Sequence, residues 1–548
     1  MAVSDPQSPP AAEQQEAPGS VAQEVRKKLT GRELYDSIGR PKYIVAPMVD
    51  RSEFVSFLSR NGKLLPGCTL PAWRMLTRSF MPPNDPVPVL AYSPMYHARL
   101  FREQAGVRAQ HFQPTRDVLD KKEKKDSSLF LDGNPTFDRP LIVQFCANDP
   151  DDLLEAAKHV APYCDAVDLN LGCPQGIARK GHYGAFLQED WPLIHRLINR
   201  LHTELPVPVT AKFRIQETKE KTLEYAQMIL SAGASFLTVH GRRREQKGHN
   251  TGLADWSYIR YLRDNLPPET VIFANGNNLN HEDLERCLAA TGADGVMSAE
   301  GNLSDPSIFS EPPAVGHEGR EYWRGRNGKG GYRIDAVFRR YLDIIYKYVL
   351  EVPVPDRKPL YLPGEEESKT AHTADQQTVV EGEEGEEEEG PPKKKQRRER
   401  YKRPASPSQA VMQGHLFQLL RPMIGQYTNV RDALARSRPG DMLAFEHVLA
   451  LVEQAVREGL QAYEADPASF DEQFAGQQAE SLTGSKATIA LYSRPFFICQ
   501  PYIRPLPEEA LENGALQPKK TRAAETKQDP IVSEPASETA TPDRLVSG

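Results

Sequence analysis

Short runs of apolar and β-branched residues recur between residues 43 and 301, and amphipathic stretches lie between most of them. The runs occupy residues 43–47, 88–94, 140–146, 166–172, 208–214, 236–241, 271–277 and 295–301. Because both faces of these runs are apolar, we expect strands of a parallel sheet that helices cover. The stretches between them have helical spacing, as in DPDDLLEAAKHVAPYC at 149–164.

Eight strand–helix units of this length predict an α/β fold of the (β/α)8 TIM-barrel type. The alternative is a doubly wound sheet, which would place a glycine-rich turn after the first strand. This chain has APMVD there, at 46–50, and therefore favours the barrel.

Helical spacing continues after the barrel, at 333–351 and 408–464, and a low-complexity stretch separates the two. We expect a small helical domain that carries a disordered charged insertion. The predicted parts are a disordered arm at 1–40, the barrel at 41–310, the helical domain at 311–352 and 407–464, the disordered acidic and basic insertion at 353–406, and a mostly disordered tail at 465–548. Within the tail, residues 492–507 are apolar enough to pack back on the body.

Charge and cysteine content narrow the possible functions. The 548 residues carry a formal charge of −7, but the glutamates at 381–389 alone supply seven negative charges, so the average does not exclude nucleic acid. Six scattered cysteines without a CxxC pair argue against a structural metal site or a disulfide framework. No leader peptide and no membrane-length apolar run are recognisable, which predicts a reducing intracellular compartment and no membrane partner.

Polar and cationic residues stand at the carboxyl ends of the predicted strands, where barrel active sites are built. They are Gln144, Asn170, Cys173, Lys212, Arg214, His240, Asn275, Asn277 and Glu300. The turn at Gly276 is of the kind whose backbone N–H groups hold a phosphate, although an ordinary left-handed turn is the alternative. If that phosphate belongs to a cofactor such as a flavin, the positive charge of Lys212 would stabilise the anionic reduced ring. The alternative for Lys212 is a salt bridge in the barrel mouth. For Cys173 the alternative is a buried structural cysteine.

Several motifs together resemble the tRNA-dihydrouridine synthase family, whose members are flavoenzymes that reduce uracil rings in tRNA. They are APMVDRSEF (46–54), DLNLGCPQGIARKGHYGAFL (168–187), AKFRI (211–215), TVHGR (238–242) and ANGN (274–277). AYSPMYHARLF (91–101) and MSAEG (297–301) resemble the eukaryotic branch that acts at sites 16 and 17 of the D-loop. The resemblance covers about 43–305 and fragments such as HLFQLLRPMI (415–424) and CQPYIRPLP (499–507).

The resemblance implies an FMN cofactor, reduced by NADPH or NADH, and tRNA as the partner. The residues that would hold FMN are Pro47, Met48, Val49, Gln144, Lys212, His240, Asn275, Gly276, Asn277, Ala299 and Glu300. Cys173 would protonate C5 of uracil after hydride reaches C6. Asn170 would bind the base, and Lys180, Arg214 and Arg242 would contact tRNA phosphate or ribose. The target nucleotide would have to flip out of the tRNA fold.

Two other functions stay open. One keeps the flavin barrel but acts on a free pyrimidine, as dihydroorotate dehydrogenases do; the helical extension and the basic segments argue against it. The other is a non-catalytic RNA-binding or scaffold protein, against which the presence of Cys173, Lys212 and His240 argues. The oligomeric state is open, with a monomer expected.

Two segments depart from the family pattern or add to it. Residues 55–71 interrupt the passage from DRSEF to the helix AWRMLTRSF (72–80), and we interpret them as a retained intron, with a genuine surface loop as the alternative. Eight Lys or Arg residues in the eleven positions 393–403 predict a nuclear import signal, with non-specific RNA contacts as the alternative. The expected location is the nucleus, the cytoplasm or both.

Overall fold

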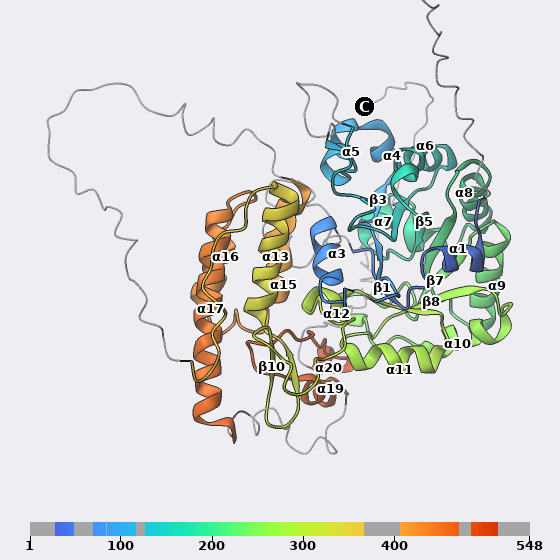
Figure 1. Cartoon of the computed structure of the whole chain (residues 1–548). Helices are drawn as coiled ribbons and strands as arrows, with labels where there is room; N and C mark the ends of the chain where they lie inside the picture. The colour runs from blue at the N-terminus through green and yellow to red at the C-terminus, as the bar shows by residue number, and fades with distance from the viewer. Residues whose placement is uncertain are drawn as a thin grey trace, which may run out of the picture.

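The computed structural model of the chain describes residues 28–48, 70–83, 85–116, 127–365, 406–468, 470 and 484–512. These residues form a barrel and, beside it, a group of long helices (Figure 1). The expectations for the other residues lie outside the described part of the chain. They concern Val49, the disorder predicted for 1–27, 366–405, 471–483 and 513–548, most of 55–71, and the basic block at 393–403.

Eight parallel strands close into the predicted barrel. They are β1 (Tyr43–Val45), β2 (Leu90–Tyr92), β4 (Leu141–Cys146), β5 (Ala166–Leu171), β6 (Val209–Arg214), β7 (Phe236–His240), β8 (Val271–Asn275) and β9 (Gly295–Ser298). The ring closes because β1 pairs with both β2 and β9, and β2 pairs with β4. The short strand β3 (Tyr96–His97) adds to β4. The predicted (β/α)8 fold is confirmed.

Successive strand residues belong to two different hydrophobic clusters, as the alternation of side chains along a strand requires. In β8, for example, Phe273 belongs to one cluster and Ala274 to the other. The second cluster also holds the inward faces of the outer helices, such as Leu153 and Ile194. Both faces of each strand are therefore buried, which explains why the strands read as continuous apolar runs.

Most of the outer helices begin at a polar residue that caps them. They include α6 (Pro150–Val160), α8 (Trp191–Glu204), α9 (Lys219–Ser231), α10 (Trp256–Asn265) and α11 (His281–Thr291). Their N-cap side chains, Asp149, Asp190, Thr218, Asp255 and Asn280, accept backbone N–H groups of the first turn. Such caps stabilise a helix by about 1 kcal/mol each, and they fix where each helix starts after a strand-end loop.

The helical part begins with a hairpin, β10 (Tyr322–Arg324) and β11 (Gly330–Tyr332). It continues through α13 (Ile334–Ile344), the π-helical turn η5 (Ile345–Leu350), α15 (Pro407–Leu419), α16 (Thr428–Arg436) and α17 (Met442–Ala465), which stand side by side in Figure 1. No helix of the described residues has both the length and the apolar character that crossing a membrane requires.

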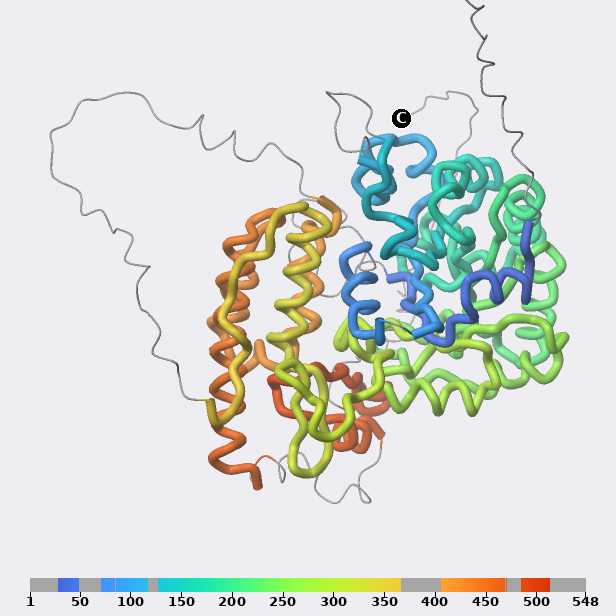
Figure 2. Tube along the Cα trace, in the orientation of Figure 1, coloured from blue at the N-terminus to red at the C-terminus, as the bar shows by residue number. Residues whose placement is uncertain are grey.

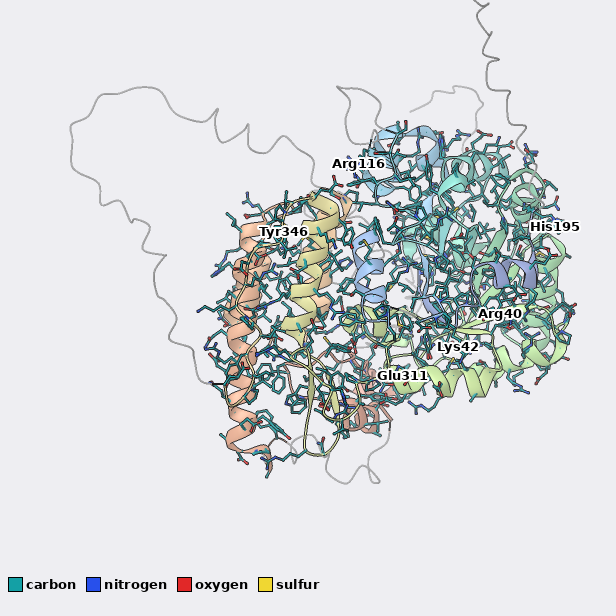
Figure 3. All side chains as sticks on the ribbon, viewed as in Figure 1. Arg40, Lys42, Arg116, His195, Glu311 and Tyr346 are labelled. Atoms are coloured by element: carbon teal, nitrogen blue, oxygen red, sulfur yellow. The ribbon has the colours of Figure 1, made fainter. Side chains whose placement is uncertain are left out.

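Helix α3 (Pro71–Arg78) joins the barrel to the helical part. The ring of Trp73 contacts those of Tyr341 in α13 and His415 in α15, with centroids 5.6 and 4.4 Å apart. Its indole N–H donates to Asn302 Oδ1 (3.0 Å) beside β9. Arg116 of the barrel, labelled in Figure 3 on the side that faces the long helices, donates to Glu351 after η5 (Nη2–Oε1 2.6 Å). Trp73 therefore packs against both parts at once.

Residues 484–512, which we call the C-terminal segment, return to the barrel between the long helices and α11 (red in Figure 2). The segment contains α19 (Gly484–Tyr492) and α20 (Pro507–Glu512). The backbone N–H of Cys499 donates to the Tyr332 carbonyl (2.9 Å), and the Tyr492 hydroxyl donates to Asp283 Oδ1 (2.7 Å). Residues 492–507 thus pack on the body.

Three stretches that the sequence analysis assigned to disordered regions have defined structure. Residues 28–40 include helix α1 (Gly31–Ser37), whose Tyr35 packs against Phe273. Residues 353–365 run extended along the helical part, where Arg357 donates to Glu446 (3.0 and 2.8 Å). The third is the part of the C-terminal segment outside 492–507, which includes most of α19 and α20. Each buries a few aromatic or cationic side chains within a polar stretch, which composition averages conceal.

Candidate active site

The side chains predicted at the strand ends line two adjoining cavities. The smaller, of about 270 Å³, is lined by Pro47, Met48, Gln144, Asn170, Cys173, Lys212, Arg214, His240, Asn275, Ala299 and Glu300. The larger, of about 400 Å³, shares His240, Asn275, Ala299 and Glu300 and adds Arg242, Gly276 and Asn277. Lys180 is exposed at the end of α7 (Gly176–Lys180) and lines neither cavity.

A chain of hydrogen bonds orients the amide side chains of the smaller cavity. Asp168 Oδ2 accepts from Gln144 Nε2 (2.8 Å), and Gln144 Oε1 accepts from Asn170 Nδ2 (2.8 Å). Asn170 Oδ1 then accepts the backbone N–H groups of Gly172 (3.0 Å) and Cys173 (2.8 Å). Because backbone N–H groups can only donate, Asn170 must turn its Oδ1 to the loop and its Nδ2 to Gln144, which fixes the orientation of both amides.

The loop that carries Cys173 is held on both sides. Asn170 holds its N–H groups, and the Cys173 carbonyl accepts from the backbone N–H of Ala185 (3.0 Å). Gly184 has φ +64°, and a Cβ there would lie 2.8 Å from the Cys173 carbonyl oxygen, so this close approach needs glycine. Burial raises the pKa of the Cys173 thiol, which therefore stays protonated at neutral pH.

Lys212 is a buried cation. Its Nζ donates to Asn275 Oδ1 (3.1 Å), and Asn275 in turn donates to the Met297 carbonyl (3.0 Å). Burial and the neighbouring Arg214 lower the pKa of Lys212 to about 8. A buried ammonium with one hydrogen bond is costly, and an anionic group in the cavity would compensate for that cost.

Arg214 braces two loops of the barrel mouth. Its Nε donates to the Gly172 carbonyl (2.8 Å), and its Nη1 donates to the carbonyls of Arg243 (3.0 Å) and Gln246 (3.1 Å). The guanidinium of Arg214 therefore donates hydrogen bonds to three backbone carbonyls of the protein itself, although it also lines the smaller cavity. Its contacts connect the loop of Cys173 with the loop after β7.

The larger cavity contains a cradle with a positive charge. Gly276 and Asn277 have φ of +116° and +62°, and a Cβ on Gly276 would meet Ala254 Cβ at 2.6 Å. Arg242 donates to Asn277 Oδ1 (2.8 Å) and lies 3.1 Å from His240 Nε2. Burial, with the cations Arg214, Lys212 and Arg242, lowers the pKa of His240 well below its usual value, so its imidazole is neutral.

These donors suit a phosphate and a planar polar ring. Backbone N–H groups of left-handed turns bind anions, and Arg242 lines the same cavity as the turn at Gly276 and Asn277. Among the described residues, no group of three or more His, Cys, Asp or Glu side chains could hold a metal ion.

Comparisons with known proteins agree with this geometry. The family model described as "Dihydrouridine synthase (Dus)" matches residues 64–324. The chain is 42% identical to the tRNA-dihydrouridine(16/17) synthase [NAD(P)(+)] of Saccharomyces cerevisiae, over 88% of each chain. It is 40% identical to the protein of the same name from Schizosaccharomyces pombe, over 88% of this chain and 92% of the relative. The chain belongs to the dihydrouridine synthase family.

In this dihydrouridine synthase, sequence reasoning missed the residues beneath the amide chain. Asp168 is fully buried in β5, and Thr210 Oγ1 donates to its Oδ1 (2.7 Å). Burial raises the pKa of Asp168 to about 7, against the effect of its hydrogen bonds from Thr210 and Gln144. An aspartate inside an apolar strand was the sequence signal for Asp168. Its hydrogen-bond partners could not be predicted, because they depend on how the strands pair.

Sequence reasoning also missed the C-terminal wall of the larger cavity in this family member. Residues 502–506 line it, together with Gly484, Ser485 and Thr488 of α19. The signal was the run CQPYIRPLP, which carries aromatic, aliphatic and cationic residues inside a polar tail.

Proposed function

We propose that this protein reduces uridine to 5,6-dihydrouridine in tRNA, at sites 16 and 17 of the D-loop. The observation that carries the proposal is the position of the Cys173 thiol at one cavity with Lys212, Asn170 and His240. The similarity over most of the chain to two relatives with the name tRNA-dihydrouridine(16/17) synthase supports the same substrate.

FMN fits the two cavities as cofactor, reduced by NADPH or NADH. The cradle at Gly276 and Asn277, with Arg242 and His240 beside it, would hold the phosphate. Lys212 and Gln144 lie in the adjoining cavity, where the ring would bind. When bound, FMN would supply a hydride to C6 of uracil.

Cys173 would act as the general acid. Its raised pKa keeps a proton on Sγ at neutral pH, ready for C5 as negative charge develops there. The hydrogen bonds from the backbone N–H groups of Gly172 and Cys173 to Asn170 fix the backbone that carries the thiol before substrate binds. Lys212 would stabilise the negative charge that accumulates at the ring.

The three basic residues assigned to tRNA differ in their contacts, and Arg214 donates to the three loop carbonyls described above. Lys180 is exposed on α7 and is free of the cavities, which suits an RNA phosphate contact. Arg242 instead donates to Asn277 at the cradle, so we assign it to the cofactor phosphate. A nucleotide enters a barrel mouth most cheaply from a loop where it is already unpaired.

The test is spectroscopic. The purified protein should show a flavin spectrum that NADPH or NADH bleaches anaerobically and that tRNA lacking dihydrouridine restores. Recovery by orotate instead of tRNA would favour a free-pyrimidine oxidoreductase. A colourless protein that binds tRNA would favour a non-catalytic RNA-binding role.

A further inference from the structure

The C-terminal segment forms one wall of the larger cavity. Its residues Tyr502, Ile503, Arg504, Pro505 and Leu506 line the same cavity as the cradle residues Gly276 and Asn277. None of these five belongs to the barrel or to the helical part that follows it. The cavity in which the cofactor phosphate would lie is therefore completed by residues from the end of the described chain.

The segment is fixed to the body at several points. The Ile334 N–H donates to the Phe497 carbonyl (3.0 Å), and the fully buried Phe497 packs against Trp323. Tyr492 donates to Asp283 on α11, as described above. Within the segment, the N–H groups of Ser485 (2.9 Å) and Leu506 (2.8 Å) donate to Glu509. These contacts hold residues 502–506 in place over the cavity.

Arg504 is the charged residue of this wall. Its Nη2 and Nε donate to the two carboxylate oxygens of Glu300 (3.0 and 3.3 Å). Glu300 itself lines both cavities, and its charge acts on Arg242 together with that of Arg504. Two guanidinium groups and one carboxylate thus share the cavity, which leaves a net positive charge. An uncompensated Glu300 would instead repel an anion bound there.

We propose that Arg504 is a second cationic ligand of the FMN phosphate, in addition to Arg242, and that the C-terminal segment is part of the cofactor site. The ligand chemistry is a phosphate monoester dianion, which a guanidinium binds through charge-assisted hydrogen bonds. The inference rests on the proposed function, because it takes FMN to be the cofactor.

Riboflavin provides the test, because it has the ring of FMN without the phosphate. Full-length protein freed of flavin is titrated with FMN and with riboflavin, and quenching of flavin fluorescence gives each Kd. Arg504→Ala should weaken FMN binding by about tenfold or more and change riboflavin binding by less than about twofold. Arg504→Lys keeps the charge and should recover part of the loss.

Arg494→Ala is the matched control. Arg494 lies in the same segment but lines a different cavity, where it donates to the carbonyls of Leu491 (3.2 Å) and Ser493 (3.0 Å). It should leave both flavin affinities unchanged. Equal losses for FMN and riboflavin in Arg504→Ala, or no loss for either, would overturn the proposal.

A loss of tRNA affinity at unchanged FMN affinity would also overturn it, since the phosphate would then be that of the RNA. If the unsubstituted protein binds neither flavin, the proposed function itself fails. If Arg504→Ala is insoluble, Arg504→Lys tests the proposal instead. Replacing a guanidinium that binds the phosphate by an ammonium should lower the ratio of FMN affinity to riboflavin affinity, and an unchanged ratio would overturn the proposal.

Discussion

Replacing Lys212 by methionine should stabilise the protein freed of flavin, although it should impair flavin reduction. Methionine has nearly the length of lysine and carries no charge, so the cavity keeps its shape. The folded protein without an anionic ligand holds the Lys212 ammonium buried with one hydrogen bond, to Asn275. Removing that charge removes its desolvation cost.

The magnitude follows from the pKa. Burial lowers the pKa of Lys212 from 10.5 to about 8, which corresponds to about 3 kcal/mol of destabilisation while the group is charged. The substitution also deprives Asn275 Oδ1 of its donor, at a cost of about 1–2 kcal/mol. The net gain is about 1–2 kcal/mol, or a rise in Tm of a few degrees at most.

The pH dependence distinguishes this cause from others. The unfolded state binds more protons than the folded state between about pH 8 and 10.5, so stability of the unsubstituted protein rises over that range. Thermal unfolding of both flavin-free proteins between pH 6 and 10 should therefore show a constant advantage for Lys212→Met below about pH 8, which shrinks above it. A variant less stable at pH 7, or a difference independent of pH, would refute the reasoning.

Three further predictions address catalysis, the first βα unit and localisation. Cys173→Ala should keep flavin and its reduction by NADPH but lose dihydrouridine formation by about 10²–10⁴-fold in single-turnover assays with tRNA; near-normal turnover would remove Cys173 from the mechanism. Deleting residues 55–71 should preserve the soluble yield and flavin content, since it joins Phe54 directly to Ala72 of α3, and transcripts that lack the segment should be found; uniform retention in an active protein would contradict the intron interpretation. Alanine substitution of the basic residues at 393–398 should move a tagged protein from nucleus to cytoplasm with little change in the salt dependence of tRNA binding; the reverse result would assign the block to RNA.

The barrel and most of its site could be predicted because both are encoded locally. Strands buried on both faces are apolar throughout, so the amide of Gln144 and the ammonium of Lys212 were exceptions visible in the sequence. Parallel strands bring their carboxyl ends to one edge whatever the details of packing. The sequence therefore predicted which side chains line the cavities, although not how they contact one another.

The contacts that were missed join residues far apart in sequence. Arg504 and Glu300 are 204 positions apart, and no periodicity relates a polar tail to a strand end. The placement of Arg242 with Asn277 depends on the left-handed backbone at Gly276 and Asn277, and a Gly-Asn pair alone does not specify it. Likewise, Asp168 accepts a hydrogen bond from Thr210 only because the register of β5 with β6 places the two residues opposite each other.

The packing at Trp73 has a consequence for the relative motion of the barrel and the long helices. Barrel residues such as Ile44 and Phe273 and helical residues such as Val337, Met412 and Val448 belong to one uninterrupted hydrophobic cluster. Domains hinge where their interface is small and polar, and a shared apolar core opposes hinging because bending would expose it to water. The barrel and the long helices should therefore move as one rigid body. A flexible partner that contacts both would have to change its own shape to fit.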